Sequence, residues 1–135
     1  MTKKTTIIVP SHPRFLGIVR GVTQKVCEIA KIDSHLISKL KLAVDEACTN
    51  VIRHTYKGNK DKKIKVQYHL KKKLMKIEIE DSGEKVNDNV LKKELPEELR
   101  PGGLGVPLIK GVFDIVNFDT KFKKGNRLVL IKFLT

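Results

Sequence analysis

The sequence predicts an α+β protein in which a mixed, mostly antiparallel sheet packs against helices on one of its faces. Two observations support this fold class. Up to about residue 56, apolar residues recur at three- and four-residue steps, which is typical of amphipathic helices. After Gly58 the apolar period changes to two, which is typical of strands with one solvated face.

Length and composition predict one soluble domain over residues 1–135. The chain is 40% hydrophobic and long enough to bury a core. It has no run of about eighteen apolar residues, so we expect no membrane span, and residues 7–9 are too short an apolar run for a secretory signal. Cys27 and Cys48 fall in helical apolar patterns, as small buried hydrophobes of a reducing compartment do. We therefore expect a cytoplasmic protein.

The net charge is strongly positive: 28 Lys and Arg residues against 15 Asp and Glu residues give +13. Such an excess raises nucleic acid or an acidic protein surface as a partner. The lysines, however, are spread through residues 60–65, 71–73 and 121–124, where Phe122 is the one interleaved aromatic residue and does not make a stacking platform. Lysine also outnumbers arginine, the preferred reader of base edges. The pattern argues against direct nucleic-acid binding.

The first elements are an edge strand and a helix. Residues 5–9 alternate weakly, as an edge strand does. Ser11 is expected to cap a helix with Pro13 in its first turn, running to about Lys31. Its apolar stripe consists of Phe15, Val19, Val22, Val26 and Ile29. Arg20 lies off this stripe, so we expect it to face outward.

The second helix carries the most unusual polar pattern. Asp33 is its expected N-cap, and the helix is expected to end near Gly58. Its apolar stripe contains Leu36, Leu40, Ala43, Val44, Ala47 and Val51. Glu46 and Asn50 are one turn apart on one face, followed by His54. A solvated polar face is one interpretation; a site beside the apolar stripe is the other.

Two hairpins are expected in the remainder of the chain. Residues 64–70 and 75–79 alternate apolar and polar side chains, which predicts a hairpin with one wet face. It ends at residues 81–83, where Gly83 permits a sharp exit from the sheet. Residues 115–122 and 127–133 are expected to form a second hairpin.

A long polar connection separates the hairpins. Residues 84–101 lack a clear strand pattern, although residues 89–95 could form a short helix. Loops of this length inside a domain are usually functional. The glycine-rich residues 102–105 come next, and Pro107 suits the first turn of the next helix. Glycines ahead of a helix N-terminus let backbone N–H groups approach a phosphate.

Three motifs succeed one another in a particular order. They are Glu46-x-x-x-Asn50 on a helix, Asp81-x-Gly83 at a strand end and Gly103-x-Gly105 after a long loop. This order resembles the N, G1 and G2 boxes of the GHKL, or Bergerat-fold, ATPases. The longer strings look like the bacterial anti-sigma factor serine kinases of the RsbW and SpoIIAB class; these strings are VPSHP at 9–13, GIVR at 17–20, AVDEACTN at 43–50 and GGLGV at 102–106.

The resemblance implies a two-layer α/β sandwich that binds ATP and Mg²⁺. It implies that Glu46 is the general base on a partner's serine hydroxyl and that Asn50 ligates Mg²⁺, roles that suit a carboxylate and a hard amide oxygen. It also implies that Asp81 accepts a hydrogen bond from the adenine amino group and that Gly83 lets the adenine base approach the backbone. His54, which like Tyr56 belongs to the tail of the helix motif, is expected to support the site and not to take part in the chemistry.

The resemblance further implies a lid over residues 84–102 and a phosphate-binding glycine string made of Gly102, Gly103, Leu104 and Gly105. Arg100 is the nearest candidate to touch the γ-phosphate. Two departures from the family pattern concern the residues expected to bind the adenine and its surroundings. Residues 84–87 lack the usual second glycine, and Asn126, assigned to the nucleotide site, replaces a threonine often found after the late glycine.

The implied partners are a STAS-type anti-anti-sigma protein, phosphorylated on serine or threonine, and a sequestered sigma factor. A homodimer is also implied, and Arg20 is the candidate partner-binding residue. Three alternatives stay open: a non-catalytic ATP-binding module of the same fold, the ATPase domain of a sensor histidine kinase and a basic nucleic-acid-binding protein. The absence of an upstream dimerisation helix with a phosphorylatable histidine argues against the second.

Overall fold

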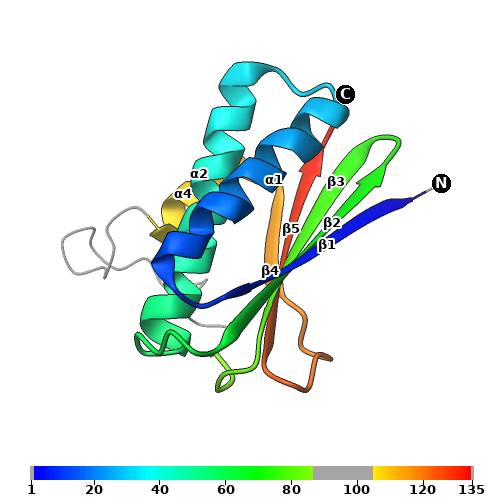
Figure 1. Ribbon diagram of the computed structural model, residues 1–135. Coiled ribbons are helices and arrows are strands. Elements are labelled where there is room, and N and C mark those ends of the chain that lie inside the picture. The colour runs from blue at the N-terminus through cyan, green and yellow to red at the C-terminus, as the bar shows by residue number, and fades with distance from the viewer. Residues whose placement is uncertain (1, 87–104, 135) are drawn as a thin grey trace.

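The computed structural model describes residues 2–86 and 105–134 as two layers, a five-stranded sheet and helices on one of its faces (Figure 1). The strands are β1 (Lys3–Pro10), β2 (Lys63–Lys71), β3 (Leu74–Asp81), β4 (Ile115–Phe118) and β5 (Asn126–Phe133). The helices are a 3₁₀ helix (Pro13–Phe15), α1 (Leu16–Ile29), α2 (Ser34–Asn50), a π-helix (Val51–Thr55) and α4 (Gly105–Val112).

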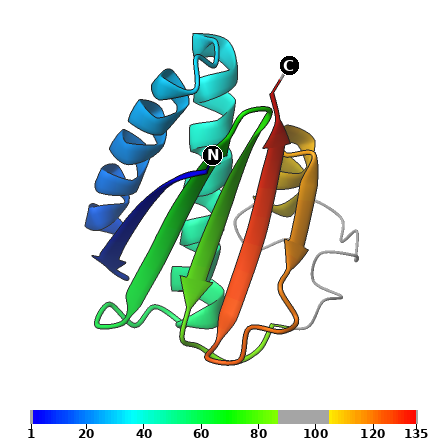
Figure 2. The same ribbon diagram turned by 90° about the vertical axis from the view of Figure 1, so that its right-hand side faces the viewer.

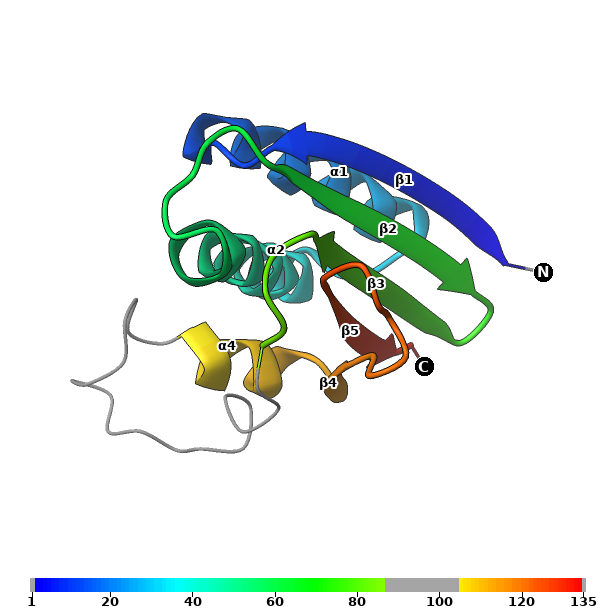
Figure 3. The same ribbon diagram turned by 90° about the horizontal axis from the view of Figure 1, so that it is seen from below.

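The strand order is β1-β2-β3-β5-β4, and each neighbouring pair is antiparallel. The expectation of a mixed sheet is therefore wrong for the described strands, because the β1–β2 and β3–β5 pairs, which long connections separate in the chain, are antiparallel like the two hairpins. All the helices lie behind the sheet when it is viewed from its open face (Figure 2). Helix α2 lies between α1 and α4 (Figure 3).

The core fills the space between the two layers. The period-two strands turn Val66 and Ile79, which are paired across β2 and β3, toward the helices, where both are fully buried. Leu40 of α2 belongs to the same core from the helix layer and is also fully buried. Burying such a side chain stabilises the fold by about 1.5–3 kcal/mol. Ile29, expected on the buried stripe, is 63% exposed because α1 ends there.

The entry into α1 differs from the sequence expectation. Ser11 is not the N-cap: its hydroxyl donates to the carbonyl of Asn59 and accepts from the N–H of Lys62. His12 caps the 3₁₀ turn instead, with Nδ1 accepting from the N–H of Arg14 at 3.2 Å. A partner 48 residues away competes for the Ser11 hydroxyl, and local cap preference cannot reveal that contact.

The second helix begins as predicted. The Asp33 carboxylate accepts from the N–H of Leu36 at 3.0 Å, which confirms Asp33 as the N-cap of α2. At its far end, the helical run continues from Asn50 through the π-helix to Thr55, and Lys57 and Gly58 then turn the chain with φ values of 51° and 82°. The predicted stop near Gly58 is confirmed, whereas the π-helical turn before it was not predicted.

The last hairpin is shorter than expected. Strand β4 ends at Phe118 and not at residue 122, because the Asp119 carboxylate accepts from the N–H of Lys121 and starts a turn. β1 is longer than predicted, and α4 lies where a helix was expected. The helix considered for residues 89–95 lies outside the described residues. No helix within residues 2–86 and 105–134 has the length and hydropathy that a bilayer crossing requires.

Candidate functional site

The exposed end of α2 presents two polar side chains without partners. Glu46 and Asn50 are both half-buried and lie one helical turn apart, as predicted. Among residues 2–86 and 105–134, neither side chain has a hydrogen-bond or ion-pair partner. A carboxylate and a carboxamide in this arrangement can accept a proton and ligate a hard cation, respectively.

Arg20 lies beside this face and bonds to the residue before Glu46. Its guanidinium Nη1 donates to the Asp45 carboxylate, which joins α1 to α2. The Arg20 side chain is 48% exposed, which agrees with the outward orientation expected from the sequence. Asp45 and Glu46 are thus two adjacent acids in different states, one neutralised by an arginine and one unpaired.

A π-helix directly succeeds Asn50. In it, the N–H of Tyr56 donates to the carbonyl of Val51 at 2.8 Å, a bond that spans five residues. Single π-helical turns inside α-helices occur frequently at functional sites. Here the wider turn leaves His54 exposed and directs the buried Tyr56 toward β2 and β3. Nothing in the local sequence pattern distinguishes this turn from continuing α-helix.

The end of β3 carries a buried carboxylate. Asp81 is 7% exposed, and its Oδ1 accepts from the N–H of Gly83 at 2.9 Å and from Nδ2 of Asn126 at 3.0 Å. Burial raises the pKa of Asp81 above its ordinary value, and these hydrogen bonds oppose the shift. Since a carboxylate can accept about four hydrogen bonds, Asp81 retains capacity to accept from a ligand.

Two glycines permit close approaches around Asp81. A Cβ on Gly83 would lie 2.4 Å from Cγ2 of Thr55, so the loop packs directly on the π-helix. The sequence interpretation, that Gly83 makes room for a bound base, thus omitted this protein contact. Gly125 has a φ of 139°, and its Cβ would lie 2.0 Å from the carbonyl oxygen of Asp81. A side chain at Gly125 would need the backbone of Asp81 and Ser82 to move, and one at Gly83 would need the Thr55 side chain or the loop to shift.

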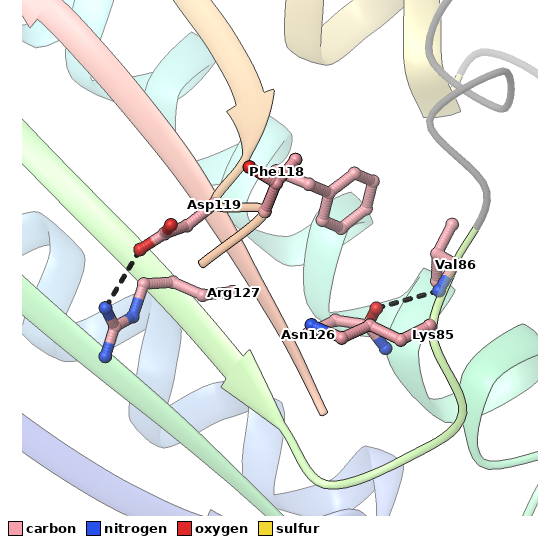
Figure 4. Close-up of a pocket in the computed structure, with 7 residues that line it drawn as sticks. Lys85, Val86, Phe118, Asp119, Asn126 and Arg127 are labelled. Atoms are coloured by element: carbon pink, nitrogen blue, oxygen red, sulfur yellow. Dashed lines mark hydrogen bonds and ion pairs between the residues drawn. The ribbon is translucent and has the colours of Figure 1, made fainter. Parts of the chain in front are cut away.

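Asn126 braces the loop that leaves β3. Its Nδ2 donates to Oδ1 of Asp81 and, at 2.7 Å, to the carbonyl of Glu84, while its Oδ1 accepts from the N–H of Val86 (Figure 4). Both amide hydrogens are thus engaged within the protein, and the residue is 4% exposed. The assignment of Asn126 to the nucleotide site stays a prediction; in the structure its side chain holds the loop that follows β3.

Two cavities flank the Asp81 loop. The larger, of about 380 Å³, lies between the π-helix and the loop and is lined by Thr55, Tyr56, Lys57, Lys62, Ser82, Gly83 and Glu84. The smaller, of about 150 Å³, lies on the other side and is lined by Lys85, Val86, Phe118, Asp119, Thr120, Asn126 and Arg127 (Figure 4). The sequence analysis did not identify Lys57 and Lys62 as lining residues, because their proximity to β3 is a tertiary contact.

The glycine string leads into a helix as predicted. Gly105 is the first residue of α4, which packs beside α2 (Figure 1). A helix N-terminus preceded by glycines is suited to binding phosphate. Arg100, Gly102, Gly103, Leu104 and the lid proposed for residues 84–102 lie outside the described residues, apart from residues 84–86.

The donor set fits a nucleotide with Mg²⁺ better than a metal held by protein alone. Among the described residues, no group of three His, Cys, Asp or Glu side chains could hold an ion. Mg²⁺ bound to a nucleotide needs only one or two protein ligands, because phosphate oxygens and water complete its shell. The unpaired carboxamide of Asn50 could supply one such ligand, and the buried Asp81 could supply an acceptor for an amino group.

The two cysteines take no part in this site. Both are free and buried, as predicted. Burial raises the pKa of the Cys27 thiol to about 11 and that of the Cys48 thiol to about 12. Both therefore remain unreactive thiols at neutral pH and act as small hydrophobic residues.

The sequence matches one protein-family model, described as a histidine kinase-like ATPase domain, over residues 9–132. The chain is 29% identical to the serine-protein kinase RsbW of Listeria innocua, over 99% of this chain and 89% of the relative. It is 30% identical to the enzyme of that name from Oceanobacillus iheyensis, over 93% and 84%. For the Bacillus subtilis protein the identity is 26%, over 89% and 86%.

Two solved structures have a similar fold. One contains the RsbU and RsbW domains of a Mycobacterium tuberculosis protein, with a TM-score of 0.68 and 14% identity, over 96% of this chain and 31% of that chain. The other is the histidine kinase domain of a blue-light activated kinase from Erythrobacter litoralis, with a TM-score of 0.59 and 12% identity, over 92% and 61%. They confirm the α+β fold class; this chain spans less than two thirds of either.

Proposed function

Since the chain belongs to the histidine kinase-like ATPase domains, and among them to the RsbW serine-protein kinases, we propose that it is an ATP-dependent protein serine/threonine kinase. The observation that carries this proposal is the unpaired Glu46 one turn before the unpaired Asn50, both on the helix that packs against the loop of the buried Asp81. This arrangement supplies a base, a metal ligand and an acceptor for an adenine amino group.

Each residue has one role in the proposed reaction. Asp81 accepts a hydrogen bond from the adenine amino group, and Asn50 ligates Mg²⁺ through its side-chain oxygen. Glu46 accepts the proton of the partner's serine hydroxyl as that oxygen attacks. ATP would supply the phosphoryl group: the serine oxygen bonds to the γ-phosphorus as the bond from that phosphorus to the bridging oxygen breaks and ADP leaves, and bound Mg²⁺ would neutralise the charge that develops. The glycine string of residues 102–105 is assigned to the phosphates, with Arg100 beside them.

The proposed substrate is a STAS-domain anti-anti-sigma protein, and the proposed second partner is a sigma factor. The family membership supports both, because the relatives are serine-protein kinases named RsbW. We place the protein in the cytoplasm, where such partners reside, and assign Arg20 to the partner surface. A homodimer is part of the proposal, and measurement of the molar mass in solution tests it directly.

A non-catalytic ATP-binding module of the same fold is the second candidate. It would use Asp81 and Asn50 in the same way but would not need a free carboxylate at Glu46. The absence of a hydrogen-bonding partner for Glu46 in the described residues favours the kinase. In contrast, Asp45 is neutralised by Arg20, so the chain provides an adjacent acid against which the role of Glu46 can be measured.

The test is phosphorylation of a purified STAS-domain anti-anti-sigma protein, at saturating substrate and ATP·Mg²⁺. The substitution Glu46→Ala is expected to lower the rate by about 10²–10⁴-fold, the usual contribution of a general base, while the Kd for ATP stays within about twofold. Asp45→Ala, the matched control, is expected to keep the rate within a few-fold. An unchanged rate in Glu46→Ala would favour another base, and no transfer by the wild type would favour the non-catalytic module.

A further inference from the structure

The Tyr56 hydroxyl joins three segments of the chain. Tyr56 comes directly after the π-helix and is 6% exposed. Its hydroxyl donates to the carbonyl of Lys63 at 2.5 Å, at the start of β2, and accepts from the backbone N–H of Ser82 at 2.9 Å. The residue thus connects the end of the α2 segment with the loop that holds Asp81.

The neighbouring side chain strengthens this connection. Cγ2 of Thr55 fills the space that a side chain on Gly83 would need. The loop is therefore held from the helix side by hydrogen bonds of the Tyr56 hydroxyl to the N–H of Ser82 and, at 3.4 Å, to the hydroxyl of Ser82, and by one close packing contact, to Gly83. From the strand side it is held by Asn126.

The π-helix explains why these contacts exist. Asn50 ends the α-helical part of α2, and the wider π-helical turn separates it from Tyr56. An added residue in such a turn rotates the later residues about the helix axis, relative to their positions in an unbroken α-helix. The turn thereby lets one continuous segment present Asn50 at the site and place the Tyr56 hydroxyl under the Asp81–Gly83 loop.

We propose that Tyr56 is a positioning residue for nucleotide binding, whose hydroxyl fixes the loop of Asp81 and Gly83 at a set distance from Asn50. The inference rests on the proposed function, in which Asp81 binds the adenine of ATP and Asn50 binds the Mg²⁺ at its phosphates. ATP spans both ends, so their spacing must match the ligand. Without the hydroxyl, ATP binding must first order the loop, and that cost weakens affinity.

A matched control is available in the second tyrosine of the chain. Tyr68 is fully buried, and its hydroxyl bonds to Oγ1 of Thr23 at 2.7 Å, between β2 and α1. Tyr56→Phe and Tyr68→Phe each remove one buried hydroxyl and retain the ring. Both are expected to lower the unfolding temperature, since each loses hydrogen bonds worth about 1 kcal/mol. Only Tyr56 touches the Asp81 loop.

The experiment is calorimetric titration of ATP·Mg²⁺ into the wild type and both variants at a temperature where all are folded. Tyr56→Phe is expected to raise the Kd about fivefold, the equivalent of one hydrogen bond, and Tyr68→Phe to leave it within about 1.5-fold. In the phosphorylation assay, Tyr56→Phe is expected to raise KM for ATP and to leave kcat unchanged. Faster amide exchange at Ser82 and Gly83 is expected in Tyr56→Phe alone.

The outcomes separate this inference from the proposed function. If the wild type binds no ATP, the proposed function fails. If the wild type binds ATP and Tyr56→Phe binds it equally well, or if both tyrosine variants weaken binding alike, the positioning role is overturned. Should Tyr56→Phe fail to fold, Thr55→Ser removes the methyl that packs on Gly83, and an unchanged Kd in that variant overturns the role in the same way.

Discussion

The face of α2 and the loop after β3 differ in how their polar groups are satisfied. On α2, Glu46 and Asn50 have no partners among the described residues. In the loop, Asp81 and Asn126 are buried and joined to each other and to the backbone. In the proposed function, the loop is a binding element that its own contacts arrange in advance, and the helix face holds groups that are free to bind a metal and to accept a proton.

The difference has a structural cause. Helix α2 is rigid through its own hydrogen bonds, so Glu46 and Asn50 hold their spacing without side-chain support. The loop has no such ladder, and contacts from β5 and the π-helix must fix it. Preorganisation of this kind reduces the entropy lost on binding. We therefore expect changes in the loop to affect affinity, and changes on the helix face to affect chemistry.

The largest effect on the prepared loop is expected from Gly83→Ala. The new Cβ would lie 2.4 Å from Cγ2 of Thr55, so the loop must move away from the π-helix. Overpacking of this kind costs about 1–3 kcal/mol, and we expect the Kd for ATP to rise at least tenfold. Calorimetric titration measures this change.

Gly21→Ala is the matched control for this substitution. A Cβ at Gly21 meets no atom within 4 Å, and the residue lies inside α1. Alanine there is expected to stabilise the protein by roughly 0.5–1 kcal/mol and to leave ATP affinity unchanged. Equal effects of the two substitutions on ATP affinity would contradict the distinction between the loop and the rest of the molecule.

An intermediate effect, on partner binding only, is expected from Arg20→Glu. The substitution replaces the ion pair with Asp45 by two like charges beside Glu46. We expect affinity for the STAS-domain partner to fall about fivefold, because loss of an interface arginine commonly costs about 1 kcal/mol or more of binding free energy. The affinity for ATP is expected to stay unchanged.

Lys25→Glu makes the same charge change on α1, at an exposed residue paired with Glu28. It is expected to alter partner affinity less than twofold. Surface plasmon resonance with the immobilised partner compares the two variants. Equal losses in both would mean that net charge, and not the Arg20 position, governs partner binding.

The smallest effect concerns the cost of the buried Asp81. Burial raises the pKa of Asp81 in the folded state. The contribution of Asp81 to the free energy of unfolding is therefore largest when the carboxyl is protonated, and it is lost as pH rises from the unfolded-state pKa through the folded-state pKa. Asp81→Asn removes this cost but retains an oxygen for the N–H of Gly83. We expect the variant to gain unfolding temperature relative to wild type at pH 7, and the gain to shrink toward pH 4.

Thermal unfolding of both proteins across this pH range checks the prediction. If the difference in unfolding temperature between wild type and Asp81→Asn did not change with pH, burial of the ionised Asp81 would not be the source of the instability. The same variant is expected to bind ATP more weakly at pH 7, because an amide cannot replace the carboxylate as an acceptor of charge-assisted hydrogen bonds. Asp81→Asn would then raise the unfolding temperature and weaken ATP binding, as expected where a buried carboxylate destabilises the fold but binds a ligand.

The helix face could be predicted from the sequence because its geometry is local. The helical period fixes Glu46 and Asn50 one turn apart, and the Asp33 cap is a contact across three residues. The hydrogen bond from Asn126 that holds the loop could not be predicted, since Asn126 and Asp81 are 45 residues apart in the sequence. The role of Ser11 was misjudged for the same reason, because a distant backbone carbonyl takes its hydroxyl.

The central claim is that α2 holds the metal end of an ATP site through Asn50. The most direct measurement is the Kd for ATP, with Mg²⁺ and with EDTA, for wild type, Asn50→Ala and the control Thr49→Ala. We predict that Mg²⁺ tightens binding at least tenfold in wild type and Thr49→Ala, and less than twofold in Asn50→Ala. Full Mg²⁺-dependent affinity in Asn50→Ala would contradict the claim.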